Sequence, residues 1–142
     1  MTPPFERFVA ILGAVLCLLT TIVLWASISA HQTMWPLPGL YFLEMLALSV
    51  VSSSIFVRGD LRSRFITWGA AGAMSAFSIL GALSVGFFYL PLALIIAVLS
   101  VISDVRNKRR ITAHLVSFLI GGISQSVLML AVIRLLDPGA VV

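Results

Sequence analysis

Two short runs of basic residues interrupt a chain that is otherwise almost free of charge. Residues 58–64 and 104–110 hold seven of the nine Lys and Arg residues, and the segments around them are apolar. Charged residues make up 10% of the chain, and the mean hydropathy is +1.15. Soluble domains carry about 25% charged residues, so this chain lacks the polar side chains that would cover a water-facing surface. Lipid must therefore be the solvent for most of it.

The apolar segments have the lengths that membrane-spanning helices need, which is about 20 residues for a hydrocarbon core about 30 Å thick. The stretch from residue 65 to residue 103 is about twice as long as one span, since a helix rises about 1.5 Å per residue. Gly86 and Pro91 lie within it, where we expect a turn and a new helix start. The sequence therefore predicts a single transmembrane domain over residues 1–142, with spans at about 8–29, 38–57, 65–84, 87–103 and 112–136.

The basic runs also predict the orientation of the helices. With five spans both runs lie on the same side as Arg7, whereas four spans would place them on opposite sides. Lys and Arg prefer the cytoplasmic side, which favours five spans. The predicted fold is an all-α, polytopic helical membrane protein with its N-terminus inside, its C-terminus outside and a negligible soluble portion. The expected location is the inner (plasma) membrane of the cell, crossed several times.

Basic residues beside apolar spans are typical of contacts with anionic lipid headgroups. The net charge of +4 therefore indicates a membrane surface, and no nucleic-acid partner is expected. We expect anionic-lipid contacts at the cytoplasmic face from Arg58, Arg62, Arg64, Arg106, Lys108, Arg109 and Arg110.

Few polar residues lie inside the predicted spans, and they form the candidate polar site. Glu44 is the only acidic residue within a span, and an intramembrane carboxylate is a candidate proton or cation site. Because it lies near the outer end of its span, an interfacial or structural role is the alternative, with Arg134 as a candidate partner. Gln125, between Ser124 and Ser126, should face protein or water, either to hold helices together or to line a polar pathway.

Small residues are concentrated in the third and last predicted spans. Gly72 and Ala76 have a small-xxx-small spacing, which lets helix backbones approach closely. Such contacts occur within one chain or at a subunit interface, and the sequence leaves both open. The residues expected to pack helices are Gly69, Gly72, Ala73, Ala76, Gly121 and Gly122.

The sequence offers no constellation typical of a catalytic or metal site. His31 and His114 lie at opposite ends of predicted spans, and Cys17 is a lone thiol inside the first span. Nothing has zinc-ligand spacing. Asp104 and Ser117 lie near His114 in sequence, but no nucleophile motif surrounds the serine. We therefore expect no metal, no cofactor and no hydrolytic triad.

The leading functional expectation is a non-enzymatic accessory or scaffold subunit of a membrane complex. Its partners would be the lipid bilayer and either further copies of itself or other membrane subunits. The alternative is a small oligomeric transporter or channel built around Glu44 and Gln125. A third interpretation is a lipid-modifying enzyme at the cytoplasmic face, with His114 in a basic cleft.

The predicted orientation can be tested by cysteine labelling. In a Cys17-free background, we expect single cysteines at Ser63 and Asn107 to resist a membrane-impermeant maleimide added to intact cells, because both basic runs should face the cytoplasm. Both positions should react once the cells are permeabilised. Labelling of one position but not the other from outside would contradict five spans.

Overall fold

The computed structural model describes residues 4–30, 37–58, 64–81, 85–107 and 111–136, and these form helices with no strand among them. The predicted all-α class is therefore confirmed. The elements are α1 (Pro4–Ser29), α2 (Leu37–Arg58), α3 (Arg64–Leu80), the short 3₁₀ helix η1 (Gly86–Tyr89), α4 (Leu90–Arg106) and α5 (Ile111–Leu136).

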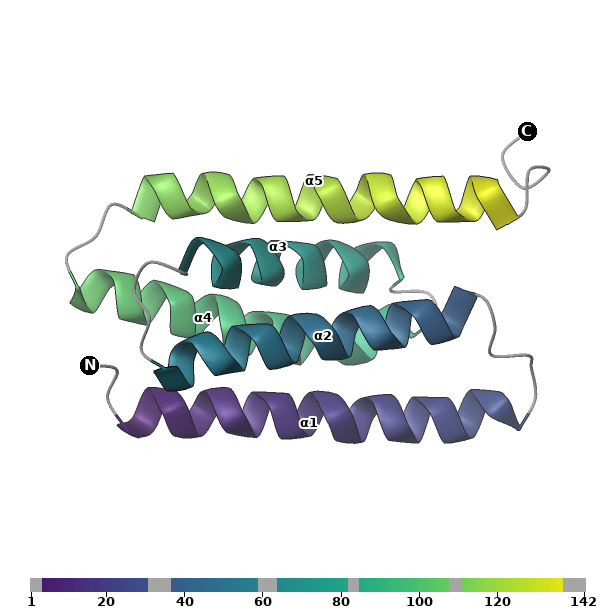
Figure 1. The fold of residues 1–142 in the computed structure, drawn as a ribbon, viewed down its shortest axis with the longest axis horizontal. Helices are drawn as coiled ribbons and strands as arrows, with labels where there is room; N and C mark the ends of the chain where they lie inside the picture. The colour runs from purple at the N-terminus through teal and green to yellow at the C-terminus, as the bar shows by residue number, and fades with distance from the viewer. Residues whose placement is uncertain (1–3, 31–36, 59–63, 82–84, 108–110, 137–142) are drawn as a thin grey trace.

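The five α-helices lie side by side and alternate in direction (Figure 1). α1 and α5 form opposite edges of the bundle, and α2, α3 and α4 lie between them (Figure 1). α5 packs almost wholly on α3, whereas α3 also contacts α2, α4 and η1. This arrangement makes α3 the link between α5 and the rest of the protein.

Within the described part of the chain, four helical segments are long and apolar enough to cross a membrane, namely Pro4–Ser29, Pro38–Arg58, Gly86–Arg106 and Ile111–Leu135. The chain is accordingly a multi-pass helical membrane protein. α3 has 17 residues and ends at Leu80, inside the expected 65–84 span, while residues 82–84 lie outside the described part of the chain. Since a crossing takes about 20 residues, α3 as a fifth complete span stays a prediction.

The long apolar stretch is broken between α3 and α4 by two glycines in backbone contact. Gly81 donates its N–H to the carbonyl of Phe77, and Gly86 donates to the carbonyl of Gly81, both at 2.8 Å. A Cβ on Gly86 would lie 2.6 Å from the carbonyl carbon of Gly81, so no larger residue fits there. The expected turn is thus present, with Gly86 closing it onto Gly81 and Pro91 in the first turn of α4.

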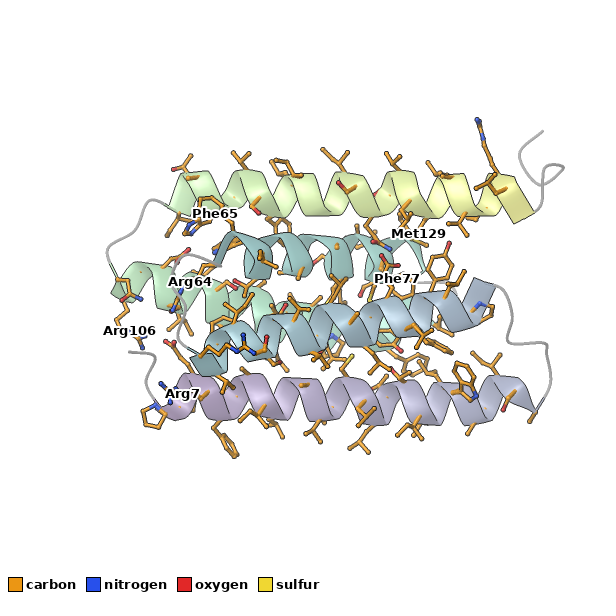
Figure 2. The ribbon with its side chains drawn as sticks, in the orientation of Figure 1. Arg7, Arg64, Phe65, Phe77, Arg106 and Met129 are labelled. Carbon is orange, nitrogen blue, oxygen red and sulfur yellow. The ribbon has the colours of Figure 1, made fainter. Side chains whose placement is uncertain are left out.

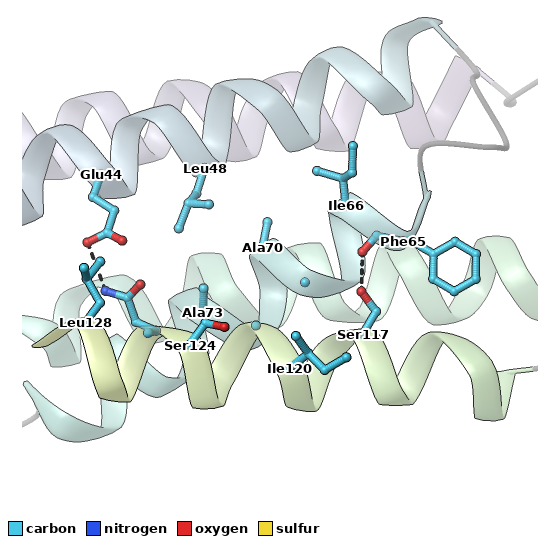
Figure 3. Close-up of a pocket in the computed structure, with 13 residues that line it drawn as sticks. Glu44, Leu48, Phe65, Ile66, Ala70, Ala73, Ser117, Ile120, Ser124 and Leu128 are labelled. Atoms are coloured by element: carbon cyan, nitrogen blue, oxygen red, sulfur yellow. Dashed lines mark hydrogen bonds between the residues drawn. The ribbon is translucent and has the colours of Figure 1, made fainter.

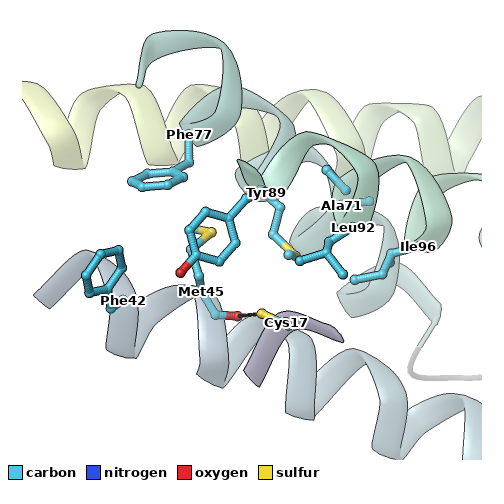
Figure 4. Packing of buried hydrophobic residues seen from close by; sticks show 10 residues of the cluster. Cys17, Phe42, Met45, Ala71, Phe77, Tyr89, Leu92 and Ile96 are labelled. Atoms are coloured by element: carbon cyan, nitrogen blue, oxygen red, sulfur yellow. Dashed lines mark hydrogen bonds between the residues drawn. The ribbon is translucent and has the colours of Figure 1, made fainter. Parts of the chain in front are cut away.

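The largest buried cluster lies where α1, α2, α3, η1 and α4 meet (Figure 4). Phe42, Phe77 and Tyr89 are almost fully buried there, with ring centroids 5.8–6.4 Å apart for the pairs that include Tyr89. The hydroxyls of Tyr89 and Thr21 share a hydrogen bond of 2.8 Å, which ties α1 to this cluster. In lipid, such close packing and internal hydrogen bonding replace the hydrophobic effect as the source of helix association.

α3 and α5 touch backbone to backbone. A Cβ on Gly72 would lie 1.9 Å from the carbonyl oxygen of Phe118, and one on Gly121 would lie 2.0 Å from the carbonyl oxygen of Gly69. Real Cβ atoms are essentially never that close to a non-bonded heavy atom. This backbone contact, which we call the α3–α5 seam, therefore requires glycine at both positions. These small residues pack helices within the chain.

The seam predicts opposite outcomes for two adjacent glycines. Gly121→Ala should lower the free energy of unfolding by about 1–3 kcal/mol, because the new methyl group forces the helices apart. Gly122→Ala is the matched control, since its Cβ would have its nearest contact, Gly72 O, at 3.5 Å. The control should be neutral or gain up to about 1 kcal/mol from helix propensity. Thermal unfolding of both variants in one detergent would measure the difference, and equal melting temperatures would contradict the seam.

Candidate functional site

A groove of about 510 Å³ lies between α2, α3 and α5 (Figure 3). Glu44 and Gln125 mark one end of it, and Phe65 and Ser117 mark the other. We call it the Glu44 groove. The small residues that line it on α3 include Gly69, Ala70 and Ala73. Larger apolar side chains come from all three helices, namely Leu48, Ile66, Ile120 and Leu128.

One hydrogen bond crosses the groove. Nε2 of Gln125 donates to Oε2 of Glu44 at 2.9 Å, joining α5 to α2 across 81 positions of sequence (Figure 3). The Gln125 side chain is 3% exposed, while Glu44 is half-buried. The structure therefore brings together the two residues that the transporter hypothesis had combined. Arg134, the other candidate partner, is exposed, and within the described residues the hydrogen bond of Glu44 is with Gln125.

The two serines that flank Gln125 face different sides of α5. Ser124 lines the Glu44 groove beside Gln125. Ser126 donates its hydroxyl to the carbonyl of Gly122 at 2.9 Å and lines a second groove on the other side of the α3–α5 seam. Of the predicted polar group, Glu44, Gln125 and Ser124 thus share one groove, and Ser126 does not.

The second groove, which we call the Ser126 groove, has a volume of about 450 Å³ and lies between α3 and α5 alone. Its small residues are Gly72, Ser75, Ala76, Gly122 and Ser126, and its remaining residues are apolar. α5 therefore has a groove along each flank of its contact with α3.

A buried polar cluster joins α3, α4 and α5 at the end of the bundle that carries the basic residues. Asp104 is fully buried and accepts a hydrogen bond from Nε1 of Trp68 at 2.8 Å. Nδ1 of His114 contacts the same carboxylate oxygen, and Nη1 of Arg64 lies 3.9 Å from the other. The ring of His114 stands edge-on to Phe65 at 4.5 Å between centroids. Three elements thus converge on one carboxylate.

The sequence does not reveal this cluster, because Asp104 begins the basic run of residues 104–110. It lies instead in the last turn of α4 and faces the interior. One signal could have revealed it. Arg64 and Trp68 are one helical turn apart, so both can reach the same acceptor from α3.

The structure describes three of the seven residues expected to contact anionic lipid, and their surroundings differ. Arg58 is exposed, as the expectation requires. Arg64 is only 3% exposed. Its guanidinium faces Asp104 and lies 5.8 Å over the ring of Phe56. Arg106 is 41% exposed and binds both carboxylate oxygens of Glu6, at 2.6 and 3.2 Å. The remaining four lie outside the described residues, namely Arg62, Lys108, Arg109 and Arg110.

The arrangement offers acid–base and hydrogen-bonding groups rather than a metal centre. Among the described residues, no three His, Cys, Asp or Glu side chains are grouped to hold a metal ion. Cys17 is fully buried, with its thiol directed at the carbonyl of Met45 at 3.7 Å. Comparisons with protein-family models, curated proteins and solved structures found no significant match. Function is therefore inferred from the geometry of this chain.

The two buried carboxylates at the basic end should differ in their contribution to stability. Asp104→Asn should lower the free energy of unfolding by about 3–5 kcal/mol, because it breaks a fully buried ion pair. Glu6→Gln is the matched control and should cost about 1 kcal/mol, since solvent reaches its partner Arg106. Unfolding in increasing SDS, followed by tryptophan fluorescence, would compare them. A larger loss in Glu6→Gln would contradict a central role for Asp104.

Proposed function

We propose that this protein is a small, non-enzymatic integral membrane protein that acts as an accessory or scaffold subunit of a membrane complex. The observation that carries this proposal is the position of α5, which packs on α3 and has the Ser126 groove along one flank. A helix held on one side only presents its remaining surface to the membrane, where another subunit can pack.

The lining of the Ser126 groove suits an apolar transmembrane helix of a partner subunit. Ser75 and Ala76 on α3 and Ser126 on α5 border the groove with short side chains, next to Gly72 and Gly122 in the α3–α5 contact. Short side chains on both walls let a third helix approach closely, and close packing is what holds helices together in lipid.

Two acidic residues that the structure describes, Glu6 and Asp104, support a structural role. Glu6 and Asp104 are buried and bound to basic or hydrogen-bonding side chains of the same chain. His114, which the lipid-enzyme interpretation required in a basic cleft, is 3% exposed and contacts Asp104. A buried, paired imidazole favours a role in holding α5 rather than in attacking a substrate.

We infer that the inner (plasma) membrane is the location and that the basic end faces the cytoplasm. Arg7, Arg64 and Arg106 gather at one end of the bundle, where α2 also ends at Arg58 (Figure 2). Clustered Lys and Arg at one membrane face are typical of the cytoplasmic side, where they also attract anionic lipids. Arg58 is the described residue best placed for such a contact, since it is exposed.

A second candidate function, a small oligomeric transporter or channel, is favoured by one observation. Glu44 and Gln125 form a hydrogen-bonded polar pair between α2 and α5. Intramembrane carboxylates of this kind mark ion and proton pathways. A pH- or cation-dependent flux in liposomes containing the purified protein would distinguish this function from an accessory role.

The accessory role predicts that filling the Ser126 groove releases a partner. Ser126→Leu should weaken association at least tenfold, because the leucine occupies the space of the docked helix. Ser27→Leu is the matched control: Ser27 also bonds the carbonyl four residues earlier, but it is exposed on α1. Native mass spectrometry of protein extracted in mild detergent would measure the complex against the 15.3 kDa chain.

Thermal unfolding should confirm that both variants still fold. A chain extracted from its own membrane without a partner would contradict the accessory role. A complex that survives Ser126→Leu unchanged would contradict the Ser126 groove as the docking site.

A further inference from the structure

The Glu44 groove contains an acidic group, and none of the described residues that line it is positively charged. Among the residues that the structure describes, Glu44 forms no ion pair, and its hydrogen-bond partner is the neutral amide of Gln125. A carboxylate in a low-dielectric site is costly unless a cation or several hydrogen bonds compensate it. The groove therefore has a place for a positively charged group.

The remainder of the groove is apolar and elongated. Small residues of α3, among them Gly69 and Ala73, lie along it, and Ile120 and Leu128 border it on α5. Its α5 wall extends from Ser117 to Leu128, which corresponds to about 17 Å along a helix. An occupant that fits both ends has a polar head at Glu44 and an apolar body directed towards Phe65.

The size of the groove favours a small molecule. Its volume of about 510 Å³ lies within the range of roughly 300–1,000 Å³ that ligand pockets occupy. Such pockets are mostly apolar with a few convergent polar groups, which describes this lining. A bare Ca²⁺ ion prefers about six to eight oxygen ligands, whereas this lining offers one carboxylate among mainly apolar residues.

We propose that the Glu44 groove binds a single-chain amphiphilic amine, with its ammonium group on Glu44 and its apolar chain along α3. Gln125 acts as a positioning residue: it holds Oε2 of Glu44, so that Oε1 is left to accept a hydrogen bond from the ammonium group. A protonated primary amine has both the charge and the N–H donors for this contact. The Glu44 groove lies on the opposite flank of α5 from the Ser126 groove, so its occupancy does not depend on the accessory role.

Dodecylamine is a suitable probe, with dodecanol as the uncharged compound of equal chain length. The purified full chain would be placed in phosphatidylcholine nanodiscs, and ligand binding would be followed by native mass spectrometry and by thermal unfolding. Wild-type protein should bind dodecylamine at least tenfold more tightly than Glu44→Gln does. Dodecanol should bind both proteins equally, since it carries no charge for Glu44 to recognise.

A second variant tests the shape of the groove independently of the charge on Glu44. Ser124→Leu narrows the groove beside Gln125 while keeping Glu44, and it should also lose at least tenfold in affinity for dodecylamine. Ser27→Leu on α1 should bind as wild type does. Melting temperatures without ligand should confirm that each variant folds.

Three results would overturn the proposal. Equal dodecylamine binding by wild type and Glu44→Gln would show partition into the bilayer only. Undiminished binding by Ser124→Leu would place the amine outside the groove. Displacement of dodecylamine by phosphatidylethanolamine added to the nanodiscs would assign the groove to a two-chain lipid instead.

Discussion

The contact between α3 and α5 is the constraint on which the rest of the structure depends. Gly72 and Gly121 bring the two backbones together so closely that a single methyl group does not fit at either position. Since lipid tails are as apolar as leucine, no hydrophobic effect drives this contact, and its stability comes from close packing. The glycines are therefore what allows α5 to be held by one neighbour, and a helix held in this way has an uncovered groove on each flank.

Asp104 gives the same seam a polar anchor at the basic end. The ion pair with Arg64 and the hydrogen bond from Trp68 attach α4 to α3, while His114 brings in the start of α5. Burying a carboxylate is costly, and the charge is tolerated because several donors converge on it. Further along α5, the hydrogen bond between Gln125 and Glu44 connects α5 to α2. Polar contacts on either side of the glycine packing thus set the register of α5.

The fold class could be predicted from sequence because lipid imposes it on any chain this apolar, and the break near Gly86 could be predicted because one helix of that length cannot fit a bilayer. The end of α3 at Leu80 could not, since it depends on Gly81 meeting Gly86 after the chain has turned. The sequence identifies Glu44 and Gln125 individually, because each is a polar side chain that is costly to expose to lipid. Their hydrogen bond depends on how α2 and α5 lie across α3, which periodicity does not encode. The burial of Asp104 could not be predicted, because its neighbours in sequence are basic, whereas the helix turns its side chain inward.

The dependence of α5 on α3 has a consequence for the order of assembly. α5 is synthesised after α1 to α4, and chains fold from the N-terminus as they emerge. Until it arrives, the glycines of α3 face the membrane without their final partner, although α3 can already pack on α2 and η1. In the finished molecule α5 is held mainly by α3, with polar contacts from His114 to α4 and from Gln125 to α2. The buried core of Phe42, Phe77 and Tyr89 belongs to the other elements. Closing the seam therefore adds α5 to a body in which α1 to α4 already contact one another.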